Sequence, residues 1–256
     1  MTPTWPSIAA GGRPALLAGW LRRARAIEAT APWVLRGSLV TAALCPGARP
    51  PADVDYLLPG DAAGFAPEAI AATVRGVAAV ADATTTLEVE GTEVIWAETS
   101  SPGLRAFLVG DAGTLRGHRF QVDLAVGDPM CVPPRPLAIA AVGEVRACAP
   151  ETLFGWKLHG LCEFGPGRWR AKDLFDLDLL WRHAGLDLAA TRAAVALAFS
   201  SRGLPLTALD DFRTRESWGT SRGGTRKWRT LGRAHPVDDL LATRARVRAA
   251  VDVILG

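Results

Sequence analysis

The pattern of hydrophobic and polar positions changes near the middle of the chain. Before residue 148, short apolar runs rich in β-formers predict strands. After that point, apolar residues recur every three or four positions, which predicts amphipathic helices. The predicted strands are 33–36, 53–58, 84–90, 93–97, 104–109 and 118–126, with a further strand at 138–142 or 144–147. The predicted helices are 14–28, 39–44, 67–80, 150–161, 171–183, 188–199 and 237–254.

Runs of strands followed by runs of helices favour an α+β fold. Strands 84–90 and 93–97 flank Gly91-Thr92, and this spacing predicts a hairpin with a two-residue turn. We therefore predict a mixed sheet with flanking helices in a domain spanning residues 1–148, followed by a helical domain spanning 149–256.

Acidic residues stand out in two of the predicted strands, because aspartate is depleted in strands. Asp53 and Asp55 flank Val54, so both carboxylates point to the same face of the strand. Asp123 lies among β-formers in a later strand. A solvent-facing strand edge would also accommodate the first pair. Clustered carboxylates suit Mg²⁺ or Mn²⁺, and three of them fit a two-metal phosphoryl-transfer site.

A Gly-Ser pair, Gly37-Ser38, precedes these aspartates. Glycine lets the backbone approach a triphosphate closely, and a serine hydroxyl with adjacent N–H groups can hold its oxygens. A Gly-Ser pair alone is also a common turn, so its value depends on the acidic strands nearby.

Together these motifs resemble the DNA-polymerase-β-like nucleotidyltransferase superfamily, with its polymerase-β-like sheet. The segments 149–161 and 168–177, which contain Lys157 and Lys172-Asp173, are similar to two blocks of the AbiEii/AbiGii toxin family. Members of that family are nucleotidyltransferase toxins of type IV toxin–antitoxin and abortive-infection systems. The resemblance covers roughly residues 30–185.

The resemblance implies transfer of a nucleoside monophosphate from an NTP to an acceptor such as a tRNA end, with Mg²⁺ or Mn²⁺ as cofactor. It also implies a neighbouring antitoxin as a partner, and a helical domain that completes the nucleotide cleft. The implied nucleotide-binding residues are Gly37, Ser38, Arg49 and Lys157. The implied catalytic residues are Asp53, Asp55, Lys157 and Asp173, and the implied metal ligands are Asp53, Asp55 and Asp123.

The sequence context of Lys157 supports a phosphate contact. It is the only lysine before Lys172, and it lies in an otherwise apolar helix, where a compact ammonium suits a phosphate. A lysine that extends along a helix edge toward water would look the same. Asp173 and Asp176 share one face near a helix start, where carboxylates also stabilise the helix dipole.

The net charge of +3 says little about nucleic acid, but the basic residues cluster in one segment, 213–233. That segment reads either as a mobile basic arm that contacts phosphates or as a solvated loop. The candidate tRNA contacts in it are Arg213, Arg222, Arg226, Lys227 and Arg229.

Two other functions remain open: a nucleotidyltransferase that modifies a small molecule such as an antibiotic, and a non-catalytic protein that binds nucleotide. Trp5 and Pro6 interrupt the start of the chain, which lacks a signal-peptide pattern, and no apolar run is long enough to span a membrane. Four widely spaced cysteines without a C-x-x-C pair fit a reducing compartment. We therefore expect a cytoplasmic protein.

Overall fold

The computed structural model describes residues 12–256; residues 1–11, with Trp5 and Pro6, lie outside the described part. The chain divides into two compact units, which we describe separately. The first, the sheet unit, consists of residues 12–43, Pro50–Asp128 and Pro134–Cys148. The second, the helical unit, consists of Leu44–Arg49, Pro129–Pro133 and Ala149–Gly256.

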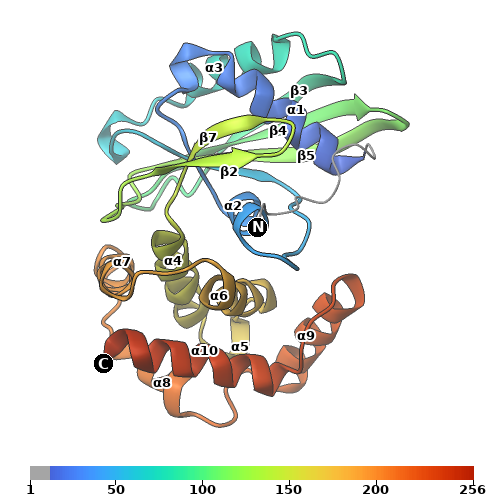
Figure 1. Ribbon diagram of the computed structural model, residues 1–256. Coiled ribbons are helices and arrows are strands. Elements are labelled where there is room, and N and C mark those ends of the chain that lie inside the picture. Colours follow the sequence, from blue (N-terminus) through green and yellow to red (C-terminus); the bar gives the residue numbers. More distant parts are fainter. Residues whose placement is uncertain (1–11) are drawn as a thin grey trace. The chain divides into compact units, whose positions relative to one another are not determined.

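The sheet unit is built on one seven-stranded mixed sheet within the described residues (Figure 1). Its strands are β1 (Val34–Arg36), β2 (Val54–Leu58), β3 (Thr85–Ile95), β4 (Gly103–Ala112), β5 (Leu115–Val126), β6 (Arg135–Ile139) and β7 (Gly143–Ala147). They lie in the order β3-β4-β5-β2-β1-β7-β6. The pairs β2/β5 and β1/β7 are parallel, and the other neighbours are antiparallel. The predicted mixed sheet with flanking helices is confirmed.

Two helices, α1 (Arg13–Arg25) and α3 (Pro67–Ala79), pack together on one face of this sheet, and α2 (Ser38–Leu44) lies on the other (Figure 1). Single-turn helices, η2 (Glu28–Thr30) and η3 (Ala62–Gly64), complete the unit. Both α1 and α3 have proline in the first turn, where its missing N–H costs no hydrogen bond. Leu17, Trp20, Leu21 and Ala24 of α1 recur at helical spacing and are buried.

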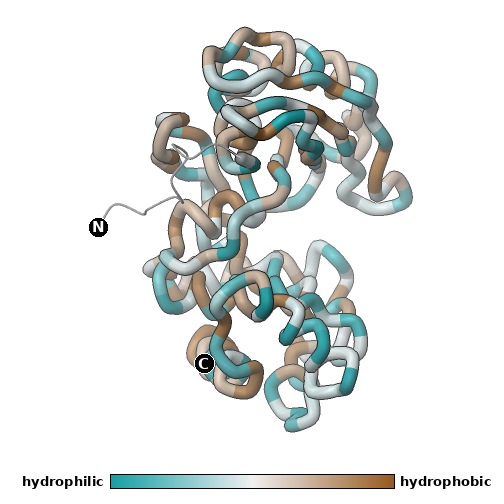
Figure 2. The backbone as a smooth tube through the Cα atoms, turned by 90° about the vertical axis from the view of Figure 1, so that its right-hand side faces the viewer, coloured by the Kyte–Doolittle hydropathy of each residue, from teal (hydrophilic) through white to brown (hydrophobic). Residues whose placement is uncertain are grey.

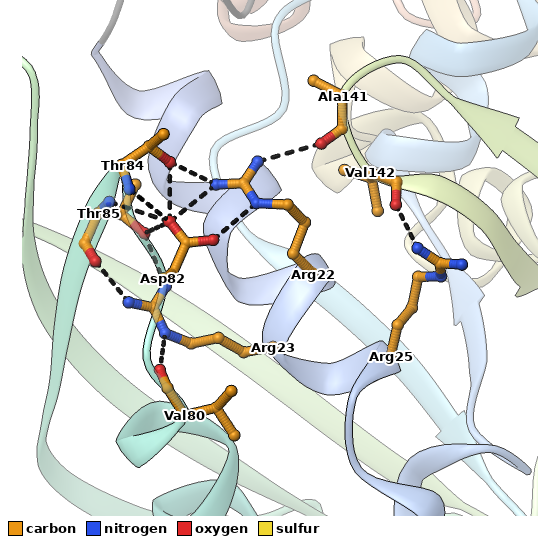
Figure 3. Close-up of polar contacts among 9 residues, drawn as sticks. All are labelled: Arg22, Arg23, Arg25, Val80, Asp82, Thr84, Thr85, Ala141 and Val142. Atoms are coloured by element: carbon orange, nitrogen blue, oxygen red, sulfur yellow. Dashed lines mark hydrogen bonds and ion pairs between the residues drawn. The ribbon is translucent and has the colours of Figure 1, made fainter.

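Arginines of α1 fix the start of β3 (Figure 3). Arg22 donates from Nε to Asp82 Oδ2 at 2.7 Å and from Nη2 to Asp82 Oδ1 at 3.0 Å. Arg23 donates to the carbonyl of Val80 at 2.7 Å and to the hydroxyl of Thr85 at 2.6 Å. Hydrogen bonds from Arg22 lower the pKa of Asp82 below its ordinary value, against the effect of burial. Ionised Asp82 therefore stabilises the fold.

Replacing Asp82 with asparagine is expected to lower the free energy of unfolding by about 2 kcal/mol at pH 7, because one charge-assisted contact with Arg22 is lost. A carboxyl whose pKa is lowered on folding stabilises the protein above its unfolded pKa of about 3.9 and loses this effect below it. The difference from wild type should therefore shrink toward pH 3, as measured by urea unfolding at both pH values. A difference that stays constant with pH would contradict this origin, and Asp210→Asn, an exposed carboxylate, is the control.

The predicted hairpin at Gly91-Thr92 is wrong. Residues 85–95 form the single strand β3, which pairs with β4 along its length. The register shifts between Val89 and Gly91, so Glu90 is the extra residue of a bulge. The chain reverses after Ile95, where Trp96 has a φ of 57°. Glycine in a strand marks a bulge as readily as a turn, and here the bulge is formed.

The helical unit consists of α4 (Pro150–Glu163), α5 (Gly165–Arg168), α6 (Ala171–His183), α7 (Leu188–Ser200), α8 (Ala208–Thr214), α9 (Arg222–Ala234) and α10 (Leu240–Leu255). Within the unit, α4 packs against α6 and α7, and α10 packs against α6 (Figure 1). Trp169, Trp218 and Trp228 pack together in its interior, with ring centroids of the first two 5.3 Å apart. The segment 213–233 is therefore no mobile arm, since most of it forms α9 and two of its tryptophans are buried.

Apolar stretches are short in both units and alternate with polar ones along the backbone (Figure 2). Across residues 12–256, no helix combines the length and apolar character that crossing a membrane requires. The four cysteines are free thiols.

Candidate functional site

A row of charged residues crosses the sheet at one register. Arg36 of β1 lies opposite Asp55 of β2, and Asp55 lies beside Asp123 of β5. Asp123 lies opposite Arg105 of β4, and Arg105 lies opposite Glu93 of β3. Side chains at one register share a face of the sheet, so five strands contribute one charged side chain each to this row.

Asp123 is tied to its neighbour in the row. Arg105 donates from Nε to Asp123 Oδ1 at 2.8 Å and from Nη2 to Oδ2 at 2.7 Å. Asp123 is 6% exposed, and Glu93 approaches Arg105 at 3.7 Å. The hydrogen bonds that Arg105 donates to Asp123, and then the charges of Asp123, Glu93 and Asp53, raise the pKa of Arg105, despite an opposing effect of burial. A two-point contact of this kind neutralises Asp123 within the protein.

Asp53 and Asp55 converge on the Gly37-Ser38 turn. The hydroxyl of Ser38 donates to Asp53 Oδ1 at 3.3 Å. Gly37 has a φ of +74°, and a Cβ at this position would lie 2.0 Å from Asp55 Oδ2. Only glycine allows both this backbone conformation and this close carboxylate. The two aspartates therefore lie against consecutive residues, Gly37 and Ser38.

The row ends on β1 in a second ion pair. Arg36 donates to Asp128 Oδ2 at 2.6 Å, and Ser101 donates to Asp128 Oδ1 at 2.8 Å. These contacts hold the strand that leads into Gly37.

The donor set fits a divalent cation that a substrate helps to bind. Within residues 12–256, no three His, Cys, Asp or Glu side chains are grouped as a complete cation site. Mg²⁺, however, usually binds one or two carboxylates and completes its shell with water and substrate phosphates. Asp53 and Asp55 supply such a pair. Asp123 could bind the ion only if its hydrogen bonds with Arg105 were broken.

A second charged cluster lies within the helical unit. Lys157 Nζ lies 2.6 Å from Asp176 Oδ2 and 3.8 Å from Asp173 Oδ1. Arg49 Nη2 lies 3.3 Å from Asp176 Oδ2, and Arg170 Nε lies 2.5 Å from Asp173 Oδ2. Asp176 and Asp173 are 1% and 3% exposed. Two buried carboxylates are thus balanced by three cations.

Electrostatics keep Asp176 ionised. Burial by itself raises its pKa, but the charges of Lys157 and Arg49 and their hydrogen bonds outweigh this effect and hold the pKa of Asp176 below its ordinary value. Burial raises the pKa of the nearby Cys45 thiol to about 12, so this cysteine stays protonated at neutral pH.

The predicted site residues fall into two groups. Gly37, Ser38, Asp53, Asp55 and Asp123 come together on the sheet unit, and Arg49, Lys157 and Asp173 come together in the helical unit. Two further residues contact these groups but were not predicted from the sequence as site residues. They are Arg105, the partner of Asp123, and Asp176, which makes the shortest contact with Lys157. The sequence contained a signal only for Asp176, namely its spacing of three residues from Asp173.

Some basic residues of segment 213–233 are paired within the helical unit, and others are exposed. Arg213 pairs with Asp252 at 2.7 Å, and Lys227 donates to the carbonyl of Trp169 at 3.0 Å. Four arginines of α9 are exposed and follow a spacing of four, three and four residues, which places them on one helix face: Arg222, Arg226, Arg229 and Arg233. The sequence of α9 contains no acidic residue. We call this face the arginine stripe.

Comparisons with known proteins agree with this architecture. Two crystal structures, JHP933 from Helicobacter pylori and a candidate nucleotidyltransferase from H. pylori, share the fold with a TM-score of 0.51 and 14% sequence identity. Each match covers 94% of this chain, together with 90% of JHP933 and 92% of the second protein. No match was found among curated proteins. The family model described as nucleotidyl transferase AbiEii toxin, type IV TA system, matches residues 21–253. The chain therefore belongs to the AbiEii family of nucleotidyltransferase toxins.

Proposed function

We propose that this nucleotidyltransferase moves a nucleoside monophosphate from an NTP to a hydroxyl group of an RNA, with tRNA ends as the favoured acceptors, and that the reaction requires Mg²⁺ or Mn²⁺. The observation that carries the proposal is the convergence of Asp53 and Asp55 on the Gly37-Ser38 turn. This arrangement presents two carboxylates and a close backbone approach at one place.

In the reaction, the acceptor oxygen forms a bond to the α-phosphorus of the NTP. The bond from that phosphorus to the bridging oxygen of the β-phosphate breaks, pyrophosphate leaves, and the hydroxyl proton passes to water. Asp53 and Asp55 would hold the divalent cation, and Asp123 is the third candidate ligand. When bound, such an ion neutralises charge on the phosphate oxygens.

Ser38 and the backbone at Gly37 bind phosphate oxygens. In the helical unit, we assign Lys157 to phosphate charge. Arg49 and Asp173 then act as positioning residues, because Arg49 shares Asp176 with Lys157 and Asp173 lies 3.8 Å from its ammonium. A charge held in place by a buried network needs little reorganisation when the substrate binds.

The arginine stripe favours RNA over a small molecule as acceptor. Its four exposed guanidinium groups follow one helix face at rises of about 6, 4.5 and 6 Å along the axis. That spacing suits successive phosphates of a nucleic-acid backbone, and arginine binds phosphate with two parallel hydrogen bonds.

Incubation with each α-labelled NTP, Mg²⁺ and total tRNA tests the proposal. Label is expected in the RNA, and omission of Mg²⁺ should remove it. Label confined to small molecules would favour the alternative of an antibiotic or metabolite acceptor. Absence of transfer to any acceptor in cell extract would favour a regulatory, nucleotide-binding role.

Neutralising two arginines of the stripe, in the double variant Arg226→Gln and Arg229→Gln, is expected to weaken RNA binding and its salt dependence. The slope of log affinity against log salt should fall by about 1.5, since each lost phosphate contact contributes about 0.7 to 0.9. The measurement is RNA binding at several salt concentrations. The matched control, Arg75→Gln with Arg116→Gln, removes two exposed charges from the sheet unit. An equal effect of both double variants would show that only net charge matters.

A further inference from the structure

A pocket with a volume of about 300 Å³ lies beside Asp53 on the sheet unit. Its lining includes Asp53, Phe107, Gln121, Glu90 and Arg119. Among these residues, only Asp53 takes part in the proposed chemistry. The volume is at the lower end of the range for small-molecule sites, so the pocket has room for a ligand of about the size of one nucleoside.

The sheet topology creates this pocket. The pairing of β2 with β5 begins at Val54 and Val122. Before Val122, β5 continues alongside β4, and within the described residues no strand of the sheet takes the place of β2. The space left at the start of β2 is bordered by Ala52 and Asp53 on one side and by β5 on the other.

Phe107, Arg119 and Gln121 line the pocket from the face of the sheet that carries the charge row, and Phe120, which alternates with them, lines it from the other face. Phe107 and Gln121 lie opposite each other, two residues from Arg105 and Asp123 respectively. Since side chains two residues apart in a strand point to the same face, the Phe107–Gln121 pair is the next rung beside the Arg105–Asp123 pair. A ligand in the pocket therefore lies next to the proposed cation-binding residues of the same unit.

The lining offers the groups that recognise a nucleoside. Phe107 is half-buried, so part of its ring is open to solvent, and an aromatic face stacks on any base. The amide of Gln121 has both donors and an acceptor for a base edge. The side chain of Arg119 is 76% exposed, and Glu90 holds it with Nη2–Oε1 and Nε–Oε2 distances of 2.7 Å. A guanidinium held in this way keeps further N–H groups for a phosphate.

We propose that this pocket binds the terminal nucleotide of the acceptor, with its base against Phe107 and its phosphate near Arg119. The inference rests on the proposed function and adds the acceptor site to it. The same chemistry is offered by an RNA end and by a free mononucleotide.

The test is steady-state transfer with Phe107→Ala, Phe107→Leu and Phe107→Tyr. The alanine and leucine variants are expected to raise KM for the RNA acceptor about 10-fold, because stacking on one base contributes about 1–3 kcal/mol. KM for the NTP and kcat should stay within about twofold of wild type. Tyrosine keeps the aromatic ring and should give the wild-type KM for the RNA acceptor. Leucine keeps most of the apolar volume, so a rise in this KM that leucine shares with alanine does not result from a packing defect. Val109→Ala, on the same strand and face, is the control.

Competition by a nucleoside monophosphate separates the two sources. If the monophosphate inhibits RNA labelling by wild type, and inhibits the Phe107→Leu variant less, an isolated nucleotide fits the pocket. If the Phe107 variants raise KM for the RNA but the monophosphate does not inhibit wild type, the pocket accepts only the end of a polymer. An unchanged acceptor KM in an active Phe107→Ala enzyme, or a raised NTP KM instead, would overturn the inference. Failure of wild type to transfer nucleotide to any acceptor would instead overturn the proposed function.

Discussion

Asparagine in place of Asp55 is expected to lower the rate of nucleotide transfer by about 10³-fold or more while the protein stays folded. A tenfold change in rate corresponds to about 1.4 kcal/mol, so this loss equals about 4 kcal/mol of transition-state stabilisation, within the range expected of a ligand to a catalytic cation. Asp55 lies against Gly37, next to the contact between Ser38 and Asp53. Its amide would keep the shape of the side chain and lose the charge.

The expected effect on stability is small. Asp55 has the like charge of Asp123 on one side and the opposite charge of Arg36 on the other, and Arg105 already neutralises Asp123. Because these effects oppose each other, removing the charge of Asp55 should change the free energy of unfolding by less than about 1 kcal/mol. A large loss of activity in a protein of unchanged stability would therefore assign Asp55 to the reaction.

Single-turnover transfer of labelled nucleotide and urea unfolding measure the two effects on the same preparation. Glu88→Gln removes an exposed carboxylate from β3 of the same sheet and should leave both quantities unchanged. If Asp55→Asn transfers nucleotide at the wild-type rate, the assignment of the cation site is wrong. The variant should also require a higher Mg²⁺ concentration for its residual activity.

The convergence of Asp53 and Asp55 could be predicted from sequence because it depends on a local rule. Two residues that flank one position of an extended chain point to the same face, and this holds for Asp53, directly before β2, and Asp55 within it, whatever the rest of the fold does. The pairing of Asp123 with Arg105 depends instead on the register between β4 and β5. Register follows from packing of whole strands, and no short motif encodes it.

The sequence did not predict helix α9, because tertiary packing decides there between a loop and a helix. Gly223 and Gly224 lower the helix propensity of the basic segment, and this favoured a loop. In the fold, Trp228 is buried beside Trp169, and a Cβ at Gly224 would lie 2.1 Å from the carbonyl oxygen of Gly219. Glycine is thus required there by close packing, and α9 forms because its buried face completes the tryptophan cluster.

Replacing Lys157 with methionine is expected to lower the free energy of unfolding by about 3 kcal/mol, near the lower end of the range for breaking a buried ion pair. Asp176 is 1% exposed and would keep only Arg49, at 3.3 Å, as its charged partner. Methionine fills a similar volume, so the loss reflects charge and not a cavity. Urea unfolding measures the change, and Lys172→Met, an exposed lysine of α6, is the control.

The double variant Lys157→Met with Asp176→Asn separates the structural role of Lys157 from its proposed role in catalysis. Removing both charges leaves no uncompensated carboxylate at position 176, and the remaining amide oxygen can still accept from Arg49. Most of the lost stability should return. If Lys157 binds phosphate, nucleotide transfer by this double variant should stay low, with a raised KM for the NTP, although its stability has recovered.

Recovery of transfer together with stability would show that Lys157 serves only to balance Asp176. The two outcomes differ because a buried charge pair can be replaced by neutral groups with little loss of stability, whereas a cation that neutralises substrate phosphate has no neutral equivalent. Lys157→Arg keeps the charge but spreads it over a planar fork, so it tests whether a compact ammonium is required. A phosphate contact through Lys157 predicts partial transfer with arginine and almost none with methionine.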